Sequence, residues 1–394
     1  MQYERTIHKQ LKDRIDTPEI VVVTGMRRVG KTTALQMIFN EIQSKNKVFI
    51  DIENPIDQRI FEEKDYNNIW ANLQVYGISN REKSYIFLDE IQAMPAVVKA
   101  VKYLHDHYNV KFFLTGSSSF YLKNLFPESL SGRKIVFDLY PLTFEEFLVF
   151  KNHIKEFHES LTDKDNYKNP VSFEKTKKLY EEYLEYGGFP QVVLTDDRNE
   201  KITQLNDIFK SYFEKDVRLI SDFKQIRNFR DLLLLLLQRT GSKLDISKLS
   251  SEVGISRETV YSYLAFLEGT YFINLATPFT RNPDREVSGA KKVYLCDNGF
   301  LRHFGRVSNG VLLENAVYLN LRKYGKIQYY QRRSGREIDF ILVDRSIGLE
   351  VKRTGTEDDY RRLALLGKAL GLQEQYIITQ EFMNIRGCIP ALEL

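Results

Sequence analysis

The residues from Gly25 to Thr33 have the types and spacing of a phosphate-binding loop, G-x-x-x-x-G-K-[ST]. Glycines permit a tight turn whose backbone N–H groups can surround an anion, and the start of the next helix adds unpaired donors. We expect Lys31 to neutralise phosphate charge and the Thr32 hydroxyl to ligate Mg²⁺. The predicted nucleotide-binding residues are Gly25, Arg28, Val29, Gly30, Lys31, Thr32 and Thr33.

Two carboxylic acids follow a second apolar segment. Residues 85–88 have the pattern of a buried strand, and Asp89 and Glu90 come directly after it. In an open parallel sheet, ligands bind at the carboxyl ends of the strands. We therefore predict that Asp89 holds the Mg²⁺ shell and that Glu90 polarises the attacking water.

Two further residues could contact phosphate. Ser117, with Ser118 close behind, follows another apolar strand and could hydrogen-bond the γ-phosphate or its water; an ordinary serine-rich turn is the alternative. Arg133 precedes a strand, where its fork of donors could reach a phosphate in its own subunit or a neighbour's. A surface salt bridge is the alternative for that arginine.

A separate set of charged residues lies near the C-terminus. Asp339 falls in one predicted strand, and Glu350 and Lys352 share one face of the next because side chains alternate along a strand. Glu314 joins them from a preceding helical stretch. Carboxylates of this kind can hold Mg²⁺, which activates water that Lys352 would orient or deprotonate. A partly buried ion-pair network without turnover is the alternative.

The elements that position the first set follow an α/β pattern. From residue 20 to about 140, apolar strands alternate with helical stretches, as in a doubly wound parallel sheet. Leu35, Ile38 and Ile42 recur at helical spacing, so a helix should begin at or near Lys31. The predicted strands are 20–24, 48–51, 85–88, 110–115 and 134–137.

The middle of the chain reads as a helix-turn-helix with a wing. Its predicted helices are 245–253 and 257–267, and its predicted wing strands are 271–275 and 291–295. The outward face of the second helix is not strongly basic, so the module could meet DNA or only pack. Residues 151–180 are rich in charged side chains and are predicted to be a solvated helical insert or a mobile loop.

Bulk composition sets wider bounds. A length of 394 residues suggests two or three domains, and a net charge of +4 does not demand a nucleic-acid partner. Two distant cysteines, Cys296 and Cys388, argue against a disulfide framework or a zinc site and favour the cytoplasm. We expect no membrane span, because no uncharged segment approaches about 18 residues.

Taken in order, five motifs resemble those of a large prokaryotic family of AAA+-type ATPases. They are Gly-Met-Arg-Arg-Val-Gly-Lys-Thr (25–32), Phe-Leu-Asp-Glu (87–90), Leu-Thr-Gly-Ser-Ser (114–118), Ser-Gly-Arg (131–133) and Tyr-Pro-Leu-Thr-Phe-Glu-Glu-Phe (140–147). Tyr-Gly-Gly-Phe-Pro (186–190) is also similar to that family. The resemblance implies an AAA+-like ATPase domain (about 1–200), a helical and winged-helix domain (about 201–300) and a restriction-endonuclease-like domain (about 301–394).

The same resemblance implies roles for single residues. Ser117 resembles the sensor-1 position, and Arg133 resembles an arginine that completes a neighbour's site, which would make the protein a homo-oligomer. Glu314, Asp339, Glu350 and Lys352 resemble the PD-(D/E)XK nuclease set.

The leading functional hypothesis is an Mg-ATP-dependent ATPase that acts on DNA and carries a nuclease-like C-terminal domain. The second hypothesis is a nucleotide-gated switch or scaffold whose C-terminal domain binds a partner without cleaving nucleic acid. A small-molecule kinase is weaker, because Glu90 and Arg133 suit attack by water better than transfer to a metabolite.

Overall fold

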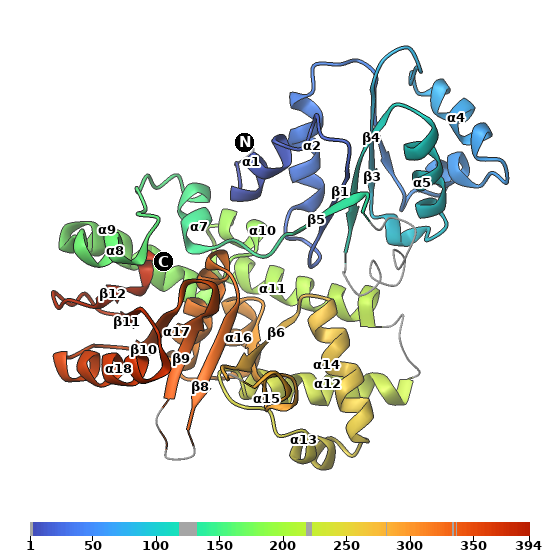
Figure 1. Cartoon of the computed structure of the whole chain (residues 1–394). Helices are drawn as coiled ribbons and strands as arrows, with labels where there is room; N and C mark the ends of the chain where they lie inside the picture. Colours follow the sequence, from blue (N-terminus) through green and yellow to red (C-terminus); the bar gives the residue numbers. More distant parts are fainter. Residues whose placement is uncertain (1–2, 118–131, 218–222, 281, 333–334, 336) are drawn as a thin grey trace. The chain divides into compact units, whose positions relative to one another are not determined.

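The chain forms two compact units. The computed structural model describes residues 3–117, 132–217, 223–280, 282–332, 335 and 337–394 (Figure 1). The first unit comprises Met1–Tyr140 with Gly269–Tyr271, and the second comprises Pro141–Glu268 with Phe272–Leu394. Strands of the predicted middle and C-terminal domains belong to one sheet.

The first unit is a parallel α/β domain, as the sequence predicted. Its five strands lie in the order β2-β3-β4-β1-β5, and all four neighbouring pairs are parallel. Strand β1 lies between β4 and β5, so the loop that follows it begins between the ends of those two strands. The elements are α1 (Thr6–Lys12), β1 (Ile20–Thr24), α2 (Lys31–Glu41), β2 (Lys47–Asp51), α3 (Pro55–Gln58), α4 (Tyr66–Val75), β3 (Ser84–Asp89), α5 (Val97–His107), β4 (Val110–Gly116) and β5 (Lys134–Asp138).

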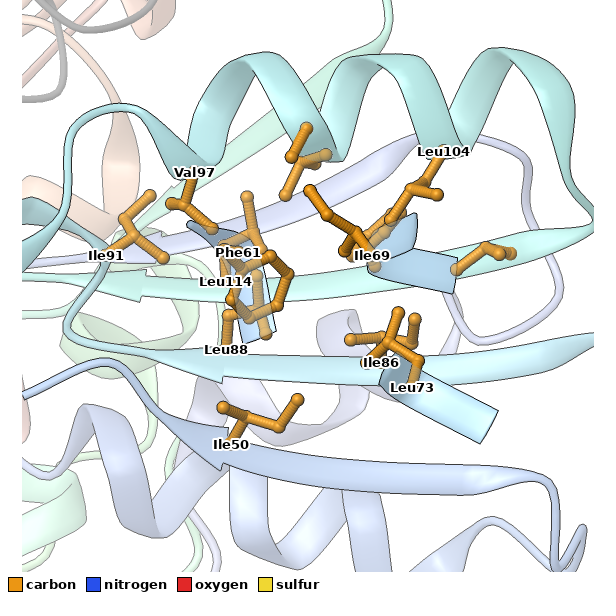
Figure 2. Close-up of a cluster of buried hydrophobic side chains, with 14 of the residues drawn as sticks. Ile50, Phe61, Ile69, Leu73, Ile86, Leu88, Ile91, Val97, Leu104 and Leu114 are labelled. Carbon is orange, nitrogen blue, oxygen red and sulfur yellow. The ribbon is translucent and has the colours of Figure 1, made fainter. Parts of the chain in front are cut away.

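Apolar side chains cover both faces of this sheet. Figure 2 shows one face, where Ile86 and Leu88 of β3 point toward Val97 and Leu104 of α5. On the other face Phe39 of α2 packs edge-on against Phe87, with ring centroids 5.3 Å apart. Successive side chains of β3 therefore pack on opposite faces of the sheet, and the strand is buried along its whole length. Asp89 lies at the end of this buried strand.

The second unit contains a mixed sheet of seven strands in the order β12-β11-β10-β9-β8-β6-β7. The pairs β6–β7, β8–β9 and β9–β10 are antiparallel, and the pairs β6–β8, β10–β11 and β11–β12 are parallel. The strands are β6 (Ile273–Pro278), β7 (Lys292–Leu295), β8 (Ile327–Gln331), β9 (Glu337–Leu342), β10 (Ile347–Lys352), β11 (Glu374–Thr379) and β12 (Cys388–Pro390).

Helices form the rest of the second unit. The two helices expected of a helix-turn-helix are present as α13 and α14, with Gly254 in the left-handed conformation between them. The strands expected to form a wing, β6 and β7, are the edge of the seven-stranded sheet. The helices are α7 (Phe144–Phe150), α8 (Leu161–Asn166), α9 (Pro170–Tyr186), α10 (Pro190–Leu194), α11 (Arg198–Tyr212), α12 (Phe223–Gln238), α13 (Ile246–Val253), α14 (Arg257–Gly269), α15 (Pro283–Ser288), α16 (Asn298–Gly305), α17 (Asn309–Leu321) and α18 (Glu357–Leu370).

The Tyr-Gly-Gly-Phe-Pro motif is part of the core of this unit. The buried carboxylate of Asp297 accepts the N–H of Gly188 at 2.6 Å and that of Gly299 at 2.8 Å. An ideal Cβ on Gly187 would lie 2.0 Å from Asp297 Oδ1, so only glycine allows this approach. The motif therefore ties the end of α9 to the start of α16.

The prediction of a solvated helical insert or a mobile loop at 151–180 was right about the helices and wrong about the solvation of some of its charged residues. Helices α8 and α9 occupy most of it, and Lys164 is buried with its ammonium donating to the carbonyl oxygen of Glu393. Lys155 pairs with the carboxylate of the same Glu393 at 2.8 Å. Charge-rich composition misled the prediction because these charges find partners 229 and 238 residues away. No helix in the described part of the chain is long and apolar enough to cross a membrane.

Candidate active site

The loop after β1 has a backbone that only certain residues can adopt. An ideal Cβ on Gly25 would lie 2.0 Å from the carbonyl oxygen of Leu139, and the φ angle of Gly25 is 152°. Arg28 and Gly30 have φ angles of 63° and 98°, which turn the chain back toward α2. Successive turns of this kind direct N–H groups to one side of a loop and create a concave site for an anion.

The other predicted loop residues differ in exposure. Arg28 and Thr33 are exposed, whereas Val29 is buried. A residue that we did not anticipate braces the loop: Arg5 donates to the carbonyl oxygens of Val29 and Tyr140, each at 2.9 Å. The sequence offered no signal for Arg5, because it lies before the first predicted strand and outside every motif.

Lys31 is buried at the first position of α2. Its Nζ atom donates to the carbonyl oxygens of Gly25 and Met26, each at 3.1 Å, and lies 4.0 Å from Glu90 Oε1. The ammonium group is therefore held inside the loop, beside Glu90, the acid predicted to polarise the attacking water. A phosphate bound by the loop would meet this positive charge directly.

Asp89 lies next to α2, at the end of β3. Its Oδ2 atom accepts the Thr32 hydroxyl at 2.8 Å, and its Oδ1 atom accepts the Thr115 hydroxyl. Burial raises the pKa of this carboxyl group above its usual value, although the hydroxyl donors of Thr115 and Thr32 favour the charged form. A hydroxyl and a carboxylate oxygen at this separation are hard ligands that fit Mg²⁺.

Glu90 has an unusual backbone and several fixed contacts. Its φ angle is 54°, and its N–H donates to Thr115 Oγ1 at 2.9 Å. The Gln92 side chain donates to Glu90 Oε2 and accepts the N–H of Ser117 at 3.1 Å. Thr115 and Gln92 were both missed from the sequence, although each stands within two residues of a predicted site residue.

Ser117 lies at the same edge of the sheet, directly after β4. Its hydroxyl oxygen is buried and has no hydrogen-bond partner among the described residues. A buried hydroxyl of this kind is available to a ligand. Ser118, the second choice, lies outside the described residues.

Arg133 lies at the end of the sheet where the strands begin, opposite the end that carries the loop. Its carbonyl oxygen accepts the N–H of Ile20, where β1 begins, while the phosphate-binding loop follows the other end of that strand. The five residues of β1 span roughly 16 Å, and this length separates Arg133 from the phosphate-binding loop. Its guanidinium pairs with Asp106 at 2.8 Å. The structure therefore does not bring Arg133 to the loop of its own subunit.

The predicted C-terminal residues form two ion-pair groups. In the first, Lys292 Nζ lies 3.7 Å from Glu314 Oε1 and 3.9 Å from Asp339 Oδ1, and the Tyr294 hydroxyl donates to Glu314 at 2.8 Å. Burial raises the pKa of Glu314, and burial together with the neighbouring Glu314 raises that of Asp339 to about 7. Lys292 and Tyr294 were missed as site residues; they lie two positions apart on one face of a predicted strand, which is a signal that could have found them.

The second group joins Glu350 and Lys352. Lys352 Nζ lies 3.1 Å from Glu350 Oε1 and 2.9 Å from Asp359 Oδ1. A cavity of about 380 Å³ is lined by Glu314, Val351 and Lys352 among other residues. Within the described ranges, no three His, Cys, Asp or Glu residues are placed to hold a metal ion together. Lys292 is the cation that lies beside Glu314 and Asp339 in the structure, and the predicted divalent-cation site stays a prediction.

Comparison with protein families divides the chain in three. Residues 17–148 match a family described as an AAA domain. Residues 177–310 and 309–391 match two domains of unknown function, DUF8612 and DUF4143. The first match confirms the AAA-type ATPase domain that the motifs indicated.

Several known proteins are similar to most of the chain. The uncharacterized protein MJ1544 of Methanocaldococcus jannaschii is 31% identical over 351 residues, which cover 86% of this chain and 75% of that protein. An uncharacterized protein of Haemophilus influenzae is 28% identical over 387 residues, covering 91% and 92% respectively. Among solved structures, a signal-transduction ATPase with a tetratricopeptide repeat sensor from Pyrococcus horikoshii has a TM-score of 0.28 and 16% identity, over 82% of this chain and 46% of that one.

Proposed function

The chain belongs to the same family as the uncharacterized protein MJ1544 of Methanocaldococcus jannaschii, and we propose that its AAA domain binds ATP with Mg²⁺ and hydrolyses it. The observation that carries this proposal is the 2.8 Å hydrogen bond between Thr32 and Asp89. This bond joins the helix after the phosphate-binding loop to an acid 57 residues later. The hydroxyl and the carboxylate together are the pair of oxygen ligands that an Mg·ATP site needs.

Each residue of the site has a proposed role. The 25–30 loop and Lys31 bind the β- and γ-phosphates, and Thr32 and Asp89 hold the metal ion. Mg²⁺, when bound, offsets negative charge on the phosphates. Glu90 orients the attacking water and accepts its proton, and the Ser117 hydroxyl, which has no partner in the described part of the chain, bonds the γ-phosphate.

The direct test is ATP turnover by the full chain. We expect phosphate release from ATP in the presence of Mg²⁺ and none after chelation of the metal. A protein that binds no ATP at millimolar concentration would contradict the proposal.

We propose that Arg133 acts on the site of a neighbouring subunit in a homo-oligomer. Two observations support this role: its distance from the loop of its own subunit, and the partial exposure of its guanidinium beside Asp106. An arginine supplied in trans can stabilise the charge that develops on the transferred phosphoryl group. Subunit mixing, described below, tests this assignment.

The wider role has two candidates, action on DNA and nucleotide-gated switching. The exposed face of α14 carries Arg257 but also Glu258 and Glu268, with Tyr261 between them. DNA-binding surfaces need net positive charge, so this face favours packing against a partner over reading a major groove. ATP turnover with and without single-stranded, duplex and branched DNA decides: stimulation supports action on DNA, and nucleotide-dependent assembly without stimulation supports the switch.

For the C-terminal region we favour the ion-pair interpretation over a metal-dependent nuclease. Lys292 already supplies the counter-charge that two neighbouring buried carboxyl groups require. The restriction-endonuclease-like assignment rests on the sequence pattern and on the cavity that Glu314, Val351 and Lys352 line. The test is metal-dependent cleavage of linear or branched DNA. If the protein cleaves, and if Asp339→Asn abolishes cleavage while ATP turnover stays intact, the nuclease interpretation is correct.

We also propose a cytoplasmic location. Its support is the two cysteines, Cys296 and Cys388, which are buried free thiols.

A further inference from the structure

The Gln92 side chain contacts two proposed residues of the ATP site, Glu90 and Ser117. Its Nε2 atom donates to Glu90 Oε2, and its Oε1 atom accepts the backbone N–H of Ser117 at 3.1 Å. Glu90 follows β3 and Ser117 follows β4, so one amide group spans the ends of two neighbouring strands.

The chemistry of the partners fixes the orientation of this amide. An ionised carboxylate can only accept hydrogen bonds, and a backbone N–H can only donate. The Gln92 nitrogen must therefore face Glu90, and its oxygen must face Ser117. Rotating the amide by 180° would place acceptor against acceptor and donor against donor. Glutamine satisfies both partners, whereas a glutamate in the same place could satisfy only one.

The other contacts of Glu90 do not fix its second carboxylate oxygen. Its backbone N–H is held by Thr115 at 2.9 Å, and its Oε1 atom lies 4.0 Å from Lys31 Nζ. Among the described residues, the hydrogen-bond donor to Oε2 is the Gln92 amide. Without that donor, the carboxylate would be free to rotate toward the Lys31 ammonium, which is the nearest positive charge and the group that must neutralise phosphate.

We propose that Gln92 is a positioning residue for ATP hydrolysis. Its two hydrogen bonds hold the Glu90 carboxylate away from Lys31 and fix the orientation of that carboxylate relative to the end of β4. The inference rests on the proposed ATP hydrolysis. Since an orientation error near 1 Å can cost about 100-fold in rate, loss of the Gln92 contact should lower kcat by between about 10-fold and 100-fold. ATP binding should be unaffected, because Gln92 does not belong to the phosphate-binding loop.

Two substitutions of similar volume separate the two hydrogen bonds. Gln92→Glu keeps the acceptor for Ser117 and removes the donor to Glu90, and Gln92→Met removes both. Both should lower kcat with little change in KM or in Tm. Gln74→Glu, the same substitution at an exposed site on α4, should leave kcat unchanged.

The decisive measurement is a double-mutant cycle with Glu90→Gln. If Gln92 acts through Glu90, then Gln92→Glu should lower single-turnover hydrolysis in the wild-type background and cause no further loss when Glu90 is already glutamine. A merely structural role would lower the rate by a similar factor in both backgrounds.

Each outcome decides. Wild-type kcat in both Gln92 variants, an effect confined to KM, or an equal loss in the Glu90→Gln background would overturn the positioning role while leaving ATP hydrolysis established. A wild-type protein without ATP turnover would overturn the proposed function and this inference together.

Discussion

Lys31 Nζ lies 4.0 Å from Glu90 Oε1, so the cation that we assign to phosphate and the acid that we assign to water are close neighbours. Their substitutions should have different effects. Lys31→Ala should abolish ATP binding, whereas Glu90→Gln should keep binding and lower turnover by at least about 100-fold, the value of a general base. Equilibrium nucleotide binding and phosphate release distinguish the two. Lys99→Ala, an exposed change on α5, is the control. Wild-type turnover by Glu90→Gln would contradict the role of Glu90.

A second prediction concerns the shape of the loop. Gly25→Ala would place a methyl group 2.0 Å from the carbonyl oxygen of Leu139, so the loop must move and ATP binding should be lost. Gly77→Ala is a matched control, because Gly77 also has a positive φ angle, 86°, but open space around it. We expect that control to cost about 1 kcal/mol of stability and no nucleotide affinity. Equal affinity in the two variants would show that the close approach to Leu139 does not matter.

The third prediction concerns Arg133. If it completes a neighbour's site, Arg133→Ala should lose activity by about 1000-fold, as an arginine finger does. Mixing it with Lys31→Ala protein should restore part of the turnover, because some interfaces would then combine an intact loop with an intact arginine. Asp106→Ala is a useful comparison, since it removes the carboxylate that pairs with Arg133 at 2.8 Å and lies 3.5 Å from His105 Nδ1, and it should keep activity. A fully active monomer would exclude the trans assignment.

Local pattern was enough to predict the AAA domain and to predict which residues of its proposed site lie close together. The β-branched segment 20–24 is β1, the helix begins at Lys31 as expected, and Asp89 and Thr32 meet because parallel strands end at one edge. Contacts set by long-range pairing could not be predicted. Examples are the approach of Arg5 to Val29 and the position of Lys292 beside Asp339.

The division between the middle and C-terminal domains also depends on long-range strand pairing. The sequence separated strands 271–275 and 291–295 from the C-terminal strands, because nothing local shows that β6 pairs with β8. That pairing also explains Lys292: β7 belongs to the sheet that contains β9, and its lysine comes close to an acid 47 positions later. A charged set that resembled a metal site therefore contains its own cation.

The last prediction tests that internal cation through pH. Burial and the neighbouring Glu314 raise the pKa of Asp339 from an ordinary 3.8 to about 7. The folded protein therefore keeps a proton that the unfolded chain releases, and this group lowers the stability as pH rises from about 4 to 7. Lys292→Met removes the cation that opposes this shift, so the pKa of Asp339 should rise further and the fall in Tm should continue to higher pH than in the wild type. Asp339→Asn should flatten the dependence.

Two controls make the result specific. Lys248→Met removes a lysine from the exposed surface of α13 and should leave the pH profile of Tm unchanged. Adding Mn²⁺ to the nucleotide-free protein should not replace Lys292, because the ion-pair interpretation provides no third ligand for a metal. If Mn²⁺ instead restored the stability of Lys292→Met, the carboxylates would be metal ligands after all, and Lys292 would be a substitute for the ion rather than the reason that none binds.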